Sequence, residues 1–321
     1  MSSSVVVRVP ARLHLGFLDP SGDSERRFGS IGLPLSEPET VLSLARSPQT
    51  IVEGPEGERA SRHLAMLCDM LDVRGHHRLT VEQAIPAHAG LGSGTQIALA
   101  VAAALRTLHG LPLDIEGDAV RMARGRRSGV GIASFGGGGV IVDAGKDDSA
   151  APPPVVARLP FPEDWRVILV FDTAGDGLHG DAEIEAFRAL PSFPRDKVGE
   201  NCRLVLMGAM PALMQRDFAA FGAAITAIQQ NVGAHFAPAQ GGVFTSRRVE
   251  RVIGRLSEAG AMGWGQSSWG PTGFIFAPSE EVARRCVEAV GDDGDGTELR
   301  IVRGRNGGAE IETHDLGLVA N

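Results

Sequence analysis

Residues 86–109 read PAHAGLGSGTQIALAVAAALRTLH, and the rest of the chain is organised around them. A proline and a glycine-rich turn at residues 90–95 lead directly into residues 96–108, which are rich in Ala, Leu and Val and contain no Pro or Gly. Such a segment predicts a buried helix. The first N–H groups of a helix bind anions well, and glycines let a ligand approach the backbone. The stretch indicates either a phosphate-binding loop or a tight turn whose helix is capped by Ser93 or Thr95.

The composition excludes several classes of protein. The 321 residues carry a net charge of −8, and 43% are hydrophobic, so we expect a globular protein without a nucleic-acid partner. Only Lys146 and Lys197 are lysines, so anion binding must rest on arginine and backbone N–H groups. Cys68, Cys202 and Cys286 form no CxxC pair, and no signal or membrane-spanning segment is recognisable. We therefore expect a cytoplasmic protein with reduced thiols and no membrane partner.

The pattern along the chain predicts a mixed α+β fold. Residues 79–83 alternate like a strand and lead into the glycine loop, which is the context that a phosphate loop requires. The Pro/Ala-rich residues 150–154 are the best candidate for a connector. We expect two domains, at residues 1–155 and 156–321, with a C-terminal tail that is able to pack back on the first domain. Further strands are predicted at 5–9, 41–44, 139–144, 167–171 and 273–277, and helices at 62–71, 202–215, 217–232 (ending near Gly233), 248–259 and 280–290; residues 264–271 are predicted as a loop.

Five motifs occur in order along most of the chain: PARLHLGFLDPSGDSERRFGSIGLPL, GLGSGTQIALAVA, GRRSGVGIASFGGGGVIVDAG, GLHG and WGQSSWGPTGF. The PxxxGLGSG loop and its Ala-rich helix resemble the phosphate-binding motif of the GHMP kinase superfamily. Together, the motifs look like the β-ribofuranosylaminobenzene 5′-phosphate synthase branch of that superfamily. The resemblance implies a two-domain α+β fold, with a ribosomal-S5-domain-2-like N-terminal domain and a ferredoxin-like α/β sandwich after it.

The same resemblance implies an enzymatic activity. Ribose 5-phosphate would pass from phosphoribosyl pyrophosphate to the ring carbon of 4-aminobenzoate or 4-hydroxybenzoate, with loss of CO₂ and pyrophosphate, in tetrahydromethanopterin biosynthesis. It also implies Mg²⁺ as the cofactor and a homodimer. Hydrogen-bond donors and a cation would be needed around the leaving pyrophosphate, because negative charge develops on it.

The resemblance also identifies candidate site residues. The candidate catalytic residues are His14, Asp19 and Arg26; Asp19 is also the candidate Mg²⁺ ligand, and Arg26 a clamp for a carboxylate or phosphate. Candidates for substrate or phosphate binding are Arg12, Arg27, Gly90, Gly92, Ser93, Gly94, Thr95, Gln96, Arg127, Ser128, Gln266, Ser267 and Ser268. His179 in the GLHG motif is a lower-ranked general acid. His14 lies between two leucines and fits a buried structural role equally well, and Asp19 also fits simple turn chemistry.

Two other functions stay open. Kinases of this superfamily commonly carry an acidic residue just after a Ser-Gly turn, but here residues 128–135 read SGVGIASF, and the nearest downstream acid is Asp143, beyond four glycines. This argues against an ATP-dependent small-molecule kinase and does not exclude nucleotide binding. A non-catalytic phosphate- or nucleotide-sensing protein on the same scaffold is the second alternative. The ordinary phosphoribosyltransferase fold is rejected, because Asp147 and Asp148 lead into prolines instead of a phosphate loop.

Overall fold

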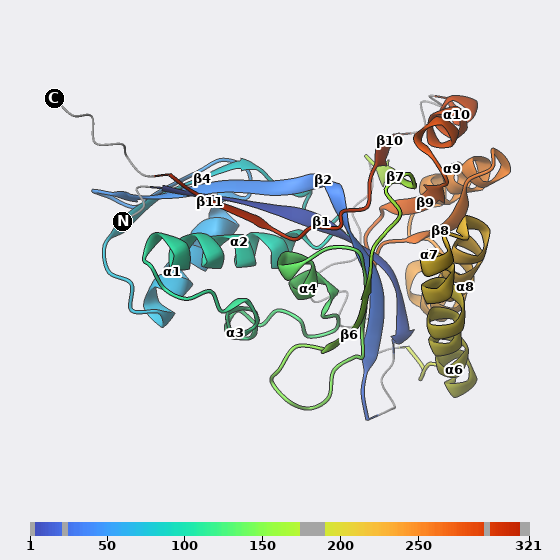
Figure 1. Cartoon of the computed structure of the whole chain (residues 1–321), viewed down its shortest axis with the longest axis horizontal. Coiled ribbons are helices and arrows are strands. Elements are labelled where there is room, and N and C mark those ends of the chain that lie inside the picture. Colours follow the sequence, from blue (N-terminus) through green and yellow to red (C-terminus); the bar gives the residue numbers. More distant parts are fainter. Residues whose placement is uncertain (1–3, 21–24, 174–189, 292–295, 315–321) are drawn as a thin grey trace.

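The chain forms two β-sheets that pack around a shared core, with helices on the outer side of each (Figure 1). The structure is a computed structural model, and it describes residues 4–20, 25–173, 190–291 and 296–314. The mixed α+β organisation expected from the sequence is confirmed. No helix in these ranges is both long enough and apolar enough to cross a bilayer. All three cysteines are free thiols.

The first sheet has seven strands in the described ranges, and its path runs β11-β1-β2-β4-β3, with β5 on β2 and β6 on β5. Its strands are β1 (Ser4–Asp19), β2 (Phe28–Ser47), β3 (Ile51–Glu53), β4 (His76–Gln83), β5 (Val140–Asp143), β6 (Val155–Leu159) and β11 (Glu310–His314). All of its pairings are antiparallel except that of β3 with β4. The connector around residue 155 therefore still belongs to the first sheet, and the C-terminal strand returns to it.

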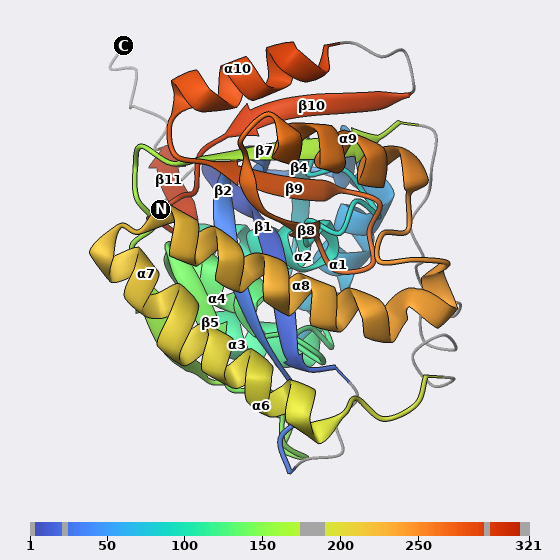
Figure 2. The same cartoon turned by 90° about the vertical axis from the view of Figure 1, so that its right-hand side faces the viewer.

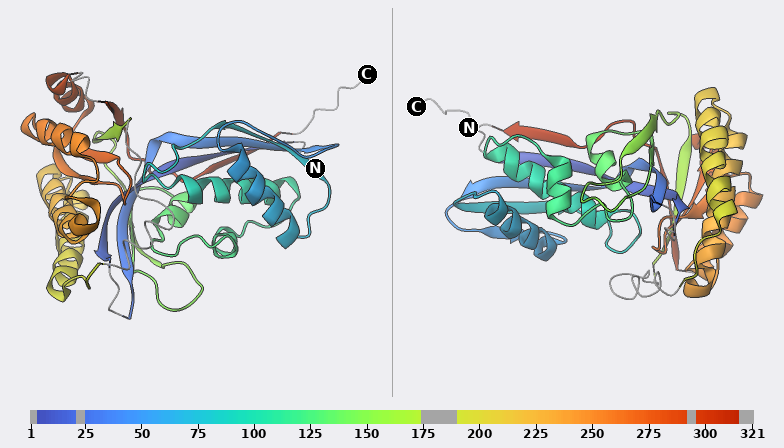
Figure 3. Two further views of the ribbon diagram at one scale, coloured as in Figure 1. Left: turned by 180° about the vertical axis from the view of Figure 1, so that it is seen from behind. Right: turned by 90° about the horizontal axis from the view of Figure 1, so that it is seen from below.

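Helices α1 (Gly57–Met70), α2 (Ser93–Leu108), α3 (Ile115–Arg121) and α4 (Val130–Gly136) lie on one face of this sheet, as both views in Figure 3 show. Helix α2 is buried on nearly all sides, because its alanines let the strands and neighbouring helices approach closely. Arg106 of α2 and Asp118 of α3 form a buried two-pronged ion pair, with N–O distances of 2.6 and 2.7 Å. This pair fixes α3 against α2.

The second sheet has the order β10-β7-β9-β8 and is antiparallel. Its strands are β7 (Arg166–Asp172), β8 (Met262–Gln266), β9 (Gly273–Ala277) and β10 (Thr297–Val302). Figure 2 shows its helices in front of the sheet: α6 (Arg195–Leu204), the π-helical turn η1 (Val205–Ala209), α7 (Met210–Gln215), α8 (Phe218–Gln240), α9 (Arg247–Glu258) and α10 (Glu280–Val290). Helices α9 and α10 cover one face with an apolar cluster of their own.

The two sheets meet along the C-terminal half of β1. Leu13 and Leu15 of β1 belong to one apolar cluster with Phe221 and Ile228 of α8 and with Phe276 of β9. Because this cluster is continuous, the second half of β1 is held between the two parts of the chain. Polar residues on this segment are therefore placed at the junction of the sheets.

Candidate functional site

The glycine loop docks directly against the loop that follows β8. Gly90 and Gly92 have left-handed backbone angles, with φ of +75° and +81°. A Cβ on Gly90 would lie 2.1 Å from the carbonyl oxygen of Ser267, so only glycine allows this approach. Gly92 caps α2 without any side-chain bond to the helix end, so the expected capping by Ser93 or Thr95 is wrong. The Thr95 and Gln96 N–H groups donate to the Gly92 carbonyl oxygen at 3.1 Å, so only the N–H groups ahead of them, at the very start of α2, are left for other acceptors.

Arg12 and Ser267 tie the loop to β1. The carbonyl oxygen of Gly90 accepts hydrogen bonds from Arg12 Nη1 at 3.0 Å and from Ser267 Oγ at 2.9 Å. The same Ser267 oxygen accepts from the backbone N–H of His14 at 3.0 Å. Ser267 is completely buried, so its hydroxyl acts as a bridge between β1 and the loop. Its contact with a substrate, expected from the sequence, stays a prediction.

Gly131, near the start of α4, lies beside Thr95 at the end of the glycine loop. A Cβ added there would lie 3.4 Å from the Thr95 methyl carbon and 3.9 Å from Arg12 Nε. Gly131 belongs to the segment 128–135, which carries no acidic side chain after its Ser-Gly turn. An acidic side chain at position 131 would therefore lie beside Arg12. Gln96, a predicted ligand, is fully buried and donates to the Gly131 carbonyl oxygen at 2.8 Å.

Asp143, the nearest acidic residue downstream of the Ser128 turn in the sequence, is buried against that turn. Its carboxylate accepts from the backbone N–H groups of Ser30, Gly129 and Gly145 at 2.9 to 3.1 Å. The Ser30 hydroxyl also donates to it and lies 2.7 Å from Ser128 Oγ. Burial raises the pKa of Asp143, and these hydrogen bonds partly oppose that rise. Asp143 therefore fixes the conformation of the Ser128 turn, and both of its carboxylate oxygens already accept hydrogen bonds from protein donors.

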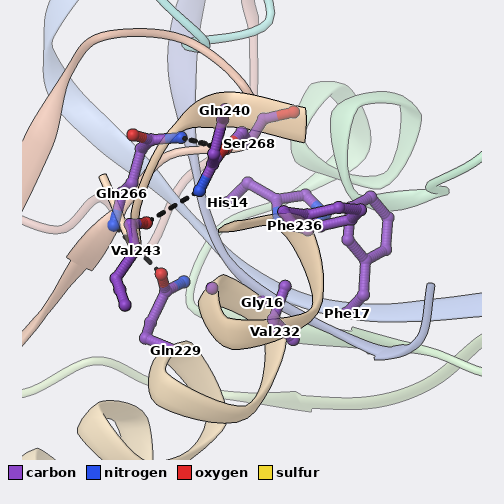
Figure 4. Close-up of a pocket in the computed structure, with 11 residues that line it drawn as sticks. His14, Gly16, Phe17, Gln229, Val232, Phe236, Gln240, Val243, Gln266 and Ser268 are labelled. Atoms are coloured by element: carbon purple, nitrogen blue, oxygen red, sulfur yellow. Dashed lines mark hydrogen bonds between the residues drawn. The ribbon is translucent and has the colours of Figure 1, made fainter. Parts of the chain in front are cut away.

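A narrow cavity lies between β1, α8 and β8 (Figure 4). Its volume is about 20 Å³, which is room for about one water molecule. His14 lines it, with its ring 4.3 Å from that of Phe17, and its Nε2 has no hydrogen-bond partner among the described residues. Burial, aided by nearby Arg12, holds the pKa of His14 well below its usual range, so the ring is neutral near pH 7. Gln266 and Ser268 line the same cavity.

Gln266 is bonded within the protein. Its side-chain oxygen accepts from Thr245 Oγ1 at 2.6 Å, and its side-chain nitrogen donates to the Ser268 carbonyl oxygen at 3.1 Å. Ser268 itself has a left-handed φ of +58° and is half-buried. These contacts hold the 266–270 loop in the shape that receives Gly90.

Asp19, Arg26 and Arg27 lie at the other end of β1. Asp19 is its last residue, seven positions beyond Arg12, which is about 23 Å along an extended strand. It is 6% exposed, and its charge adds to the effect of burial in raising the pKa of Cys202 on α6. Along β1, Asp19 therefore lies well beyond Arg12, the residue that contacts the glycine loop.

The two arginines are engaged by the segment after β5. Arg26 donates to the carbonyl oxygens of Ala144 and Gly145 at 3.0 and 2.9 Å and pairs with Asp147 at 3.1 Å. Arg27 pairs with Asp148. Arg127 is half-buried just before the Ser128 turn, and His179 lies outside the described residues.

Two basic residues near the start of α2 were not selected from the sequence. Arg124, which follows α3, has its Nη1 atom 3.5 Å from where a Cβ on Gly94 would lie. Its Nη2 atom is 3.4 Å from Nε2 of His63 on α1. The signal available was the run of arginines at residues 124–127; nothing in the local sequence links His63 to it.

The described residues contain no preformed metal-binding site of several ionisable side chains. No group of three or more His, Cys, Asp or Glu side chains in these ranges is arranged to hold a metal ion. Magnesium is commonly bound by one or two carboxylates together with substrate phosphates. A dedicated protein-only magnesium site is therefore not supported by these residues, and the role of Asp19 as a ligand stays a prediction.

Comparison with known proteins places this chain in a defined family. Models of the GHMP kinase N-terminal domain and the GHMP kinase C-terminal domain match residues 59–139 and 209–296. A protein of Methanothermobacter thermautotrophicus named β-ribofuranosylphenol 5′-phosphate synthase is 33% identical over 96% of this chain and 99% of its own length. Proteins of the same name from Archaeoglobus fulgidus and Methanocaldococcus jannaschii are 32% and 28% identical, over 95% and 96% of this chain and 99% and 100% of their own lengths.

Solved structures agree on the fold. A homoserine kinase from Cytophaga hutchinsonii superimposes with a TM-score of 0.70 at 18% identity, covering 97% of this chain and 98% of its own. A mevalonate diphosphate decarboxylase from Staphylococcus aureus gives 0.67 at 18% identity, with the same coverage. The GHMP-kinase-like fold expected from the sequence is therefore confirmed.

Proposed function

Since the chain belongs to the β-ribofuranosylphenol 5′-phosphate synthase family within the GHMP kinase superfamily, we propose that it is a decarboxylating phosphoribosyltransferase. Its donor is phosphoribosyl pyrophosphate, its acceptor is 4-hydroxybenzoate or 4-aminobenzoate, and it acts in tetrahydromethanopterin biosynthesis. The phenol in the name of the relatives favours 4-hydroxybenzoate, because that acceptor leaves a hydroxyl on the ring of the product.

The proposed reaction makes one carbon–carbon bond and breaks two bonds. The ring carbon that bears the carboxylate bonds to C1 of the ribose, and the C1–oxygen bond breaks with its electron pair leaving on pyrophosphate. The bond from the ring to the carboxylate then breaks, CO₂ leaves, and the electron pair returns to the ring. Loss of CO₂ thus restores the aromatic ring, and no acceptor hydroxyl has to be deprotonated.

The observation that carries the proposal is the glycine at position 131. A kinase of this fold needs a group that orients or deprotonates the acceptor hydroxyl. Here a Cβ at that position would lie 3.9 Å from Arg12 Nε, and the residue itself has no side chain. A carbon nucleophile needs no such base, whereas a leaving pyrophosphate benefits from an arginine whose positive charge is not offset by a carboxylate at position 131.

The other parts of the proposal concern cofactor, assembly and catalytic residues. Bound Mg²⁺ would neutralise the pyrophosphate and would be held mainly by the donor and water. Asp19, the ligand expected from the sequence, lies about 23 Å along β1 from Arg12, so it would have to reach the ion from the far end of the bound donor. The homodimer stays a prediction. Asp19→Ala and Arg26→Ala are each expected to lower kcat at least tenfold, about 1.4 kcal/mol in activation free energy. A variant with near-normal kinetics would show that the residue has a structural role only.

The test uses the purified full chain with Mg²⁺, phosphoribosyl pyrophosphate and 4-hydroxybenzoate carrying ¹⁴C in its carboxylate. Labelled CO₂ and pyrophosphate should be released in equal amounts, and a parallel reaction with labelled 4-aminobenzoate gives the acceptor preference. ATP hydrolysis that depends on a small alcohol, with no CO₂ release, would establish a kinase instead. Binding of phosphate compounds without either turnover would establish a sensor.

A further inference from the structure

Two buried nitrogen atoms, Nδ1 of His63 on α1 and Nε of Arg124 after α3, have no hydrogen-bond partner among the residues that the structure describes. The guanidinium of Arg124 approaches Nε2 of His63 at 3.4 Å, and only an unprotonated Nε2 can accept from it. The proton of the neutral His63 ring then resides on Nδ1. Both this Nδ1 and Arg124 Nε are inaccessible to solvent, and neither has a partner among the residues that the structure describes.

The charges around this pair are of one sign. In the described part of the chain, every charged group that shifts the pKa of Arg124 or His63 is an arginine: Arg59, Arg62, Arg126 or, for His63, Arg124 itself. Burial, aided by the charges of Arg124, Arg59 and Arg62, lowers the pKa of His63 to about 4. A buried donor without an acceptor destabilises the folded state, and a desolvated cation does so more strongly. An arrangement of this kind is completed by an anion.

The end of the Arg124 side chain lies beside the first turn of α2. Arg124 Nη1 lies 3.5 Å from the Cβ position of Gly94, the second residue of α2. The first turn of α2 has no side-chain cap, and no acidic side chain lies in it. Backbone N–H groups and the positive end of the helix dipole act on the same space. His63 is only 6% exposed, whereas Ser93, Gly94 and Arg124 are partly accessible, so a solute can reach the site from the loop side.

We propose that Arg124 and His63, together with the first turn of α2, form a binding site for a pyrophosphate group. The identity of that group rests on the proposed function, in which it is the leaving group of the donor. Arg124 contacts its oxygens, and His63 is a positioning residue that holds the guanidinium through Nε2. Arg12 Nε and the Thr95 methyl carbon both lie within 4 Å of where a Cβ on Gly131 would be, so a second arginine adjoins the start of α2.

The test is binding of inorganic pyrophosphate to the purified full chain, measured by titration calorimetry without any turnover. Arg124→Gln should weaken binding at least tenfold. Arg74→Gln is the matched control, because Arg74 is an exposed arginine paired with Asp72 at the surface, and it should bind within twofold of the wild type. Equal losses in both variants would show a general charge effect and overturn the proposal, as would unchanged binding in Arg124→Gln.

A second variant separates loss of the site from loss of the fold. Gly94 has ordinary helical backbone angles, and a Cβ there would make only normal contacts. Gly94→Asp would supply a carboxylate to Arg124 and to the helix N-terminus, so it should raise the unfolding temperature and abolish pyrophosphate binding. A variant that is stabilised but still binds pyrophosphate, or one that is destabilised, would refute the assignment. If pyrophosphate binds as expected while CO₂ release fails, the proposed function falls and this site stands.

Discussion

Replacing Ser267 with alanine tests whether the bridge between β1 and the glycine loop holds the two parts of the site together. The wild-type hydroxyl accepts from the buried His14 N–H and donates to the Gly90 carbonyl oxygen. In Ser267→Ala the N–H loses its acceptor, which costs about 1–3 kcal/mol. The carbonyl keeps its bond from Arg12, so its loss is smaller, about 0.5–1 kcal/mol. The free energy of unfolding should fall by about 1.5–4 kcal/mol in total.

The assay is urea unfolding followed by tryptophan fluorescence. Trp269, next to this bridge, is buried with its ring 4.8 Å from that of Phe236, so its emission reports on the docked loop. Ser268→Ala is the control, because that residue is half-buried in the same loop. Unfolding of Ser267→Ala within about 0.5 kcal/mol of the wild type, the range of ordinary surface substitutions, would refute the reasoning.

Three further predictions concern other parts of the chain. Asp118→Ala leaves Arg106 charged and largely buried, so the free energy of unfolding in urea should fall by about 3–5 kcal/mol; a loss near zero would mean that the arginine finds water. The pKa of His63 is about 4 in the native protein and about 6.5 in the unfolded chain. Between pH 6.5 and pH 4 the unfolded state therefore binds more protons than the native state. The free energy of unfolding should fall by up to about 3 kcal/mol as the pH is lowered through this range. His63→Gln should remove that loss in urea titrations across this range, and an identical pH profile would contradict the assignment. Gly131→Asp places a carboxylate beside Arg12 and should raise the KM for phosphoribosyl pyrophosphate about tenfold in the CO₂-release assay; an unchanged KM would show that Arg12 does not face the donor.

The local patterns predicted the glycine loop and its helix because both depend on neighbouring residues. The expected strand at residues 5–9 was too short, since β1 continues to Asp19. Pro10 and Gly16 suggested an end, but β-bulges at both positions absorb them. Helix α8 likewise passes Gly233, where the glycine makes room for the Val243 side chain instead of ending the helix. The predicted loop at 264–271 begins inside β8, which ends at Gln266.

The site could be predicted only in part, because its contacts join segments far apart in the sequence. The motif order indicated that the glycine loop and the 266–268 segment belong together, and the hydrogen bonds of Ser267 join them. No pattern showed that Arg26 would be held by carbonyl oxygens 118 and 119 residues away. The contact between Arg124 and His63 spans 61 residues and two helices, and it also depends on tertiary packing alone.

The pairing of β11 with β1 has a consequence for the order in which the protein is made. Five residue pairs join them, from Ser4 opposite His314 to Arg8 opposite Glu310, so β1 leaves the ribosome long before the strand that completes its edge. Until then one edge of β1 offers unpaired backbone groups to other chains. Closing so long a loop makes folding slow. Chains truncated before residue 310 should therefore aggregate during synthesis, even though the glycine loop and all the residues around it are present.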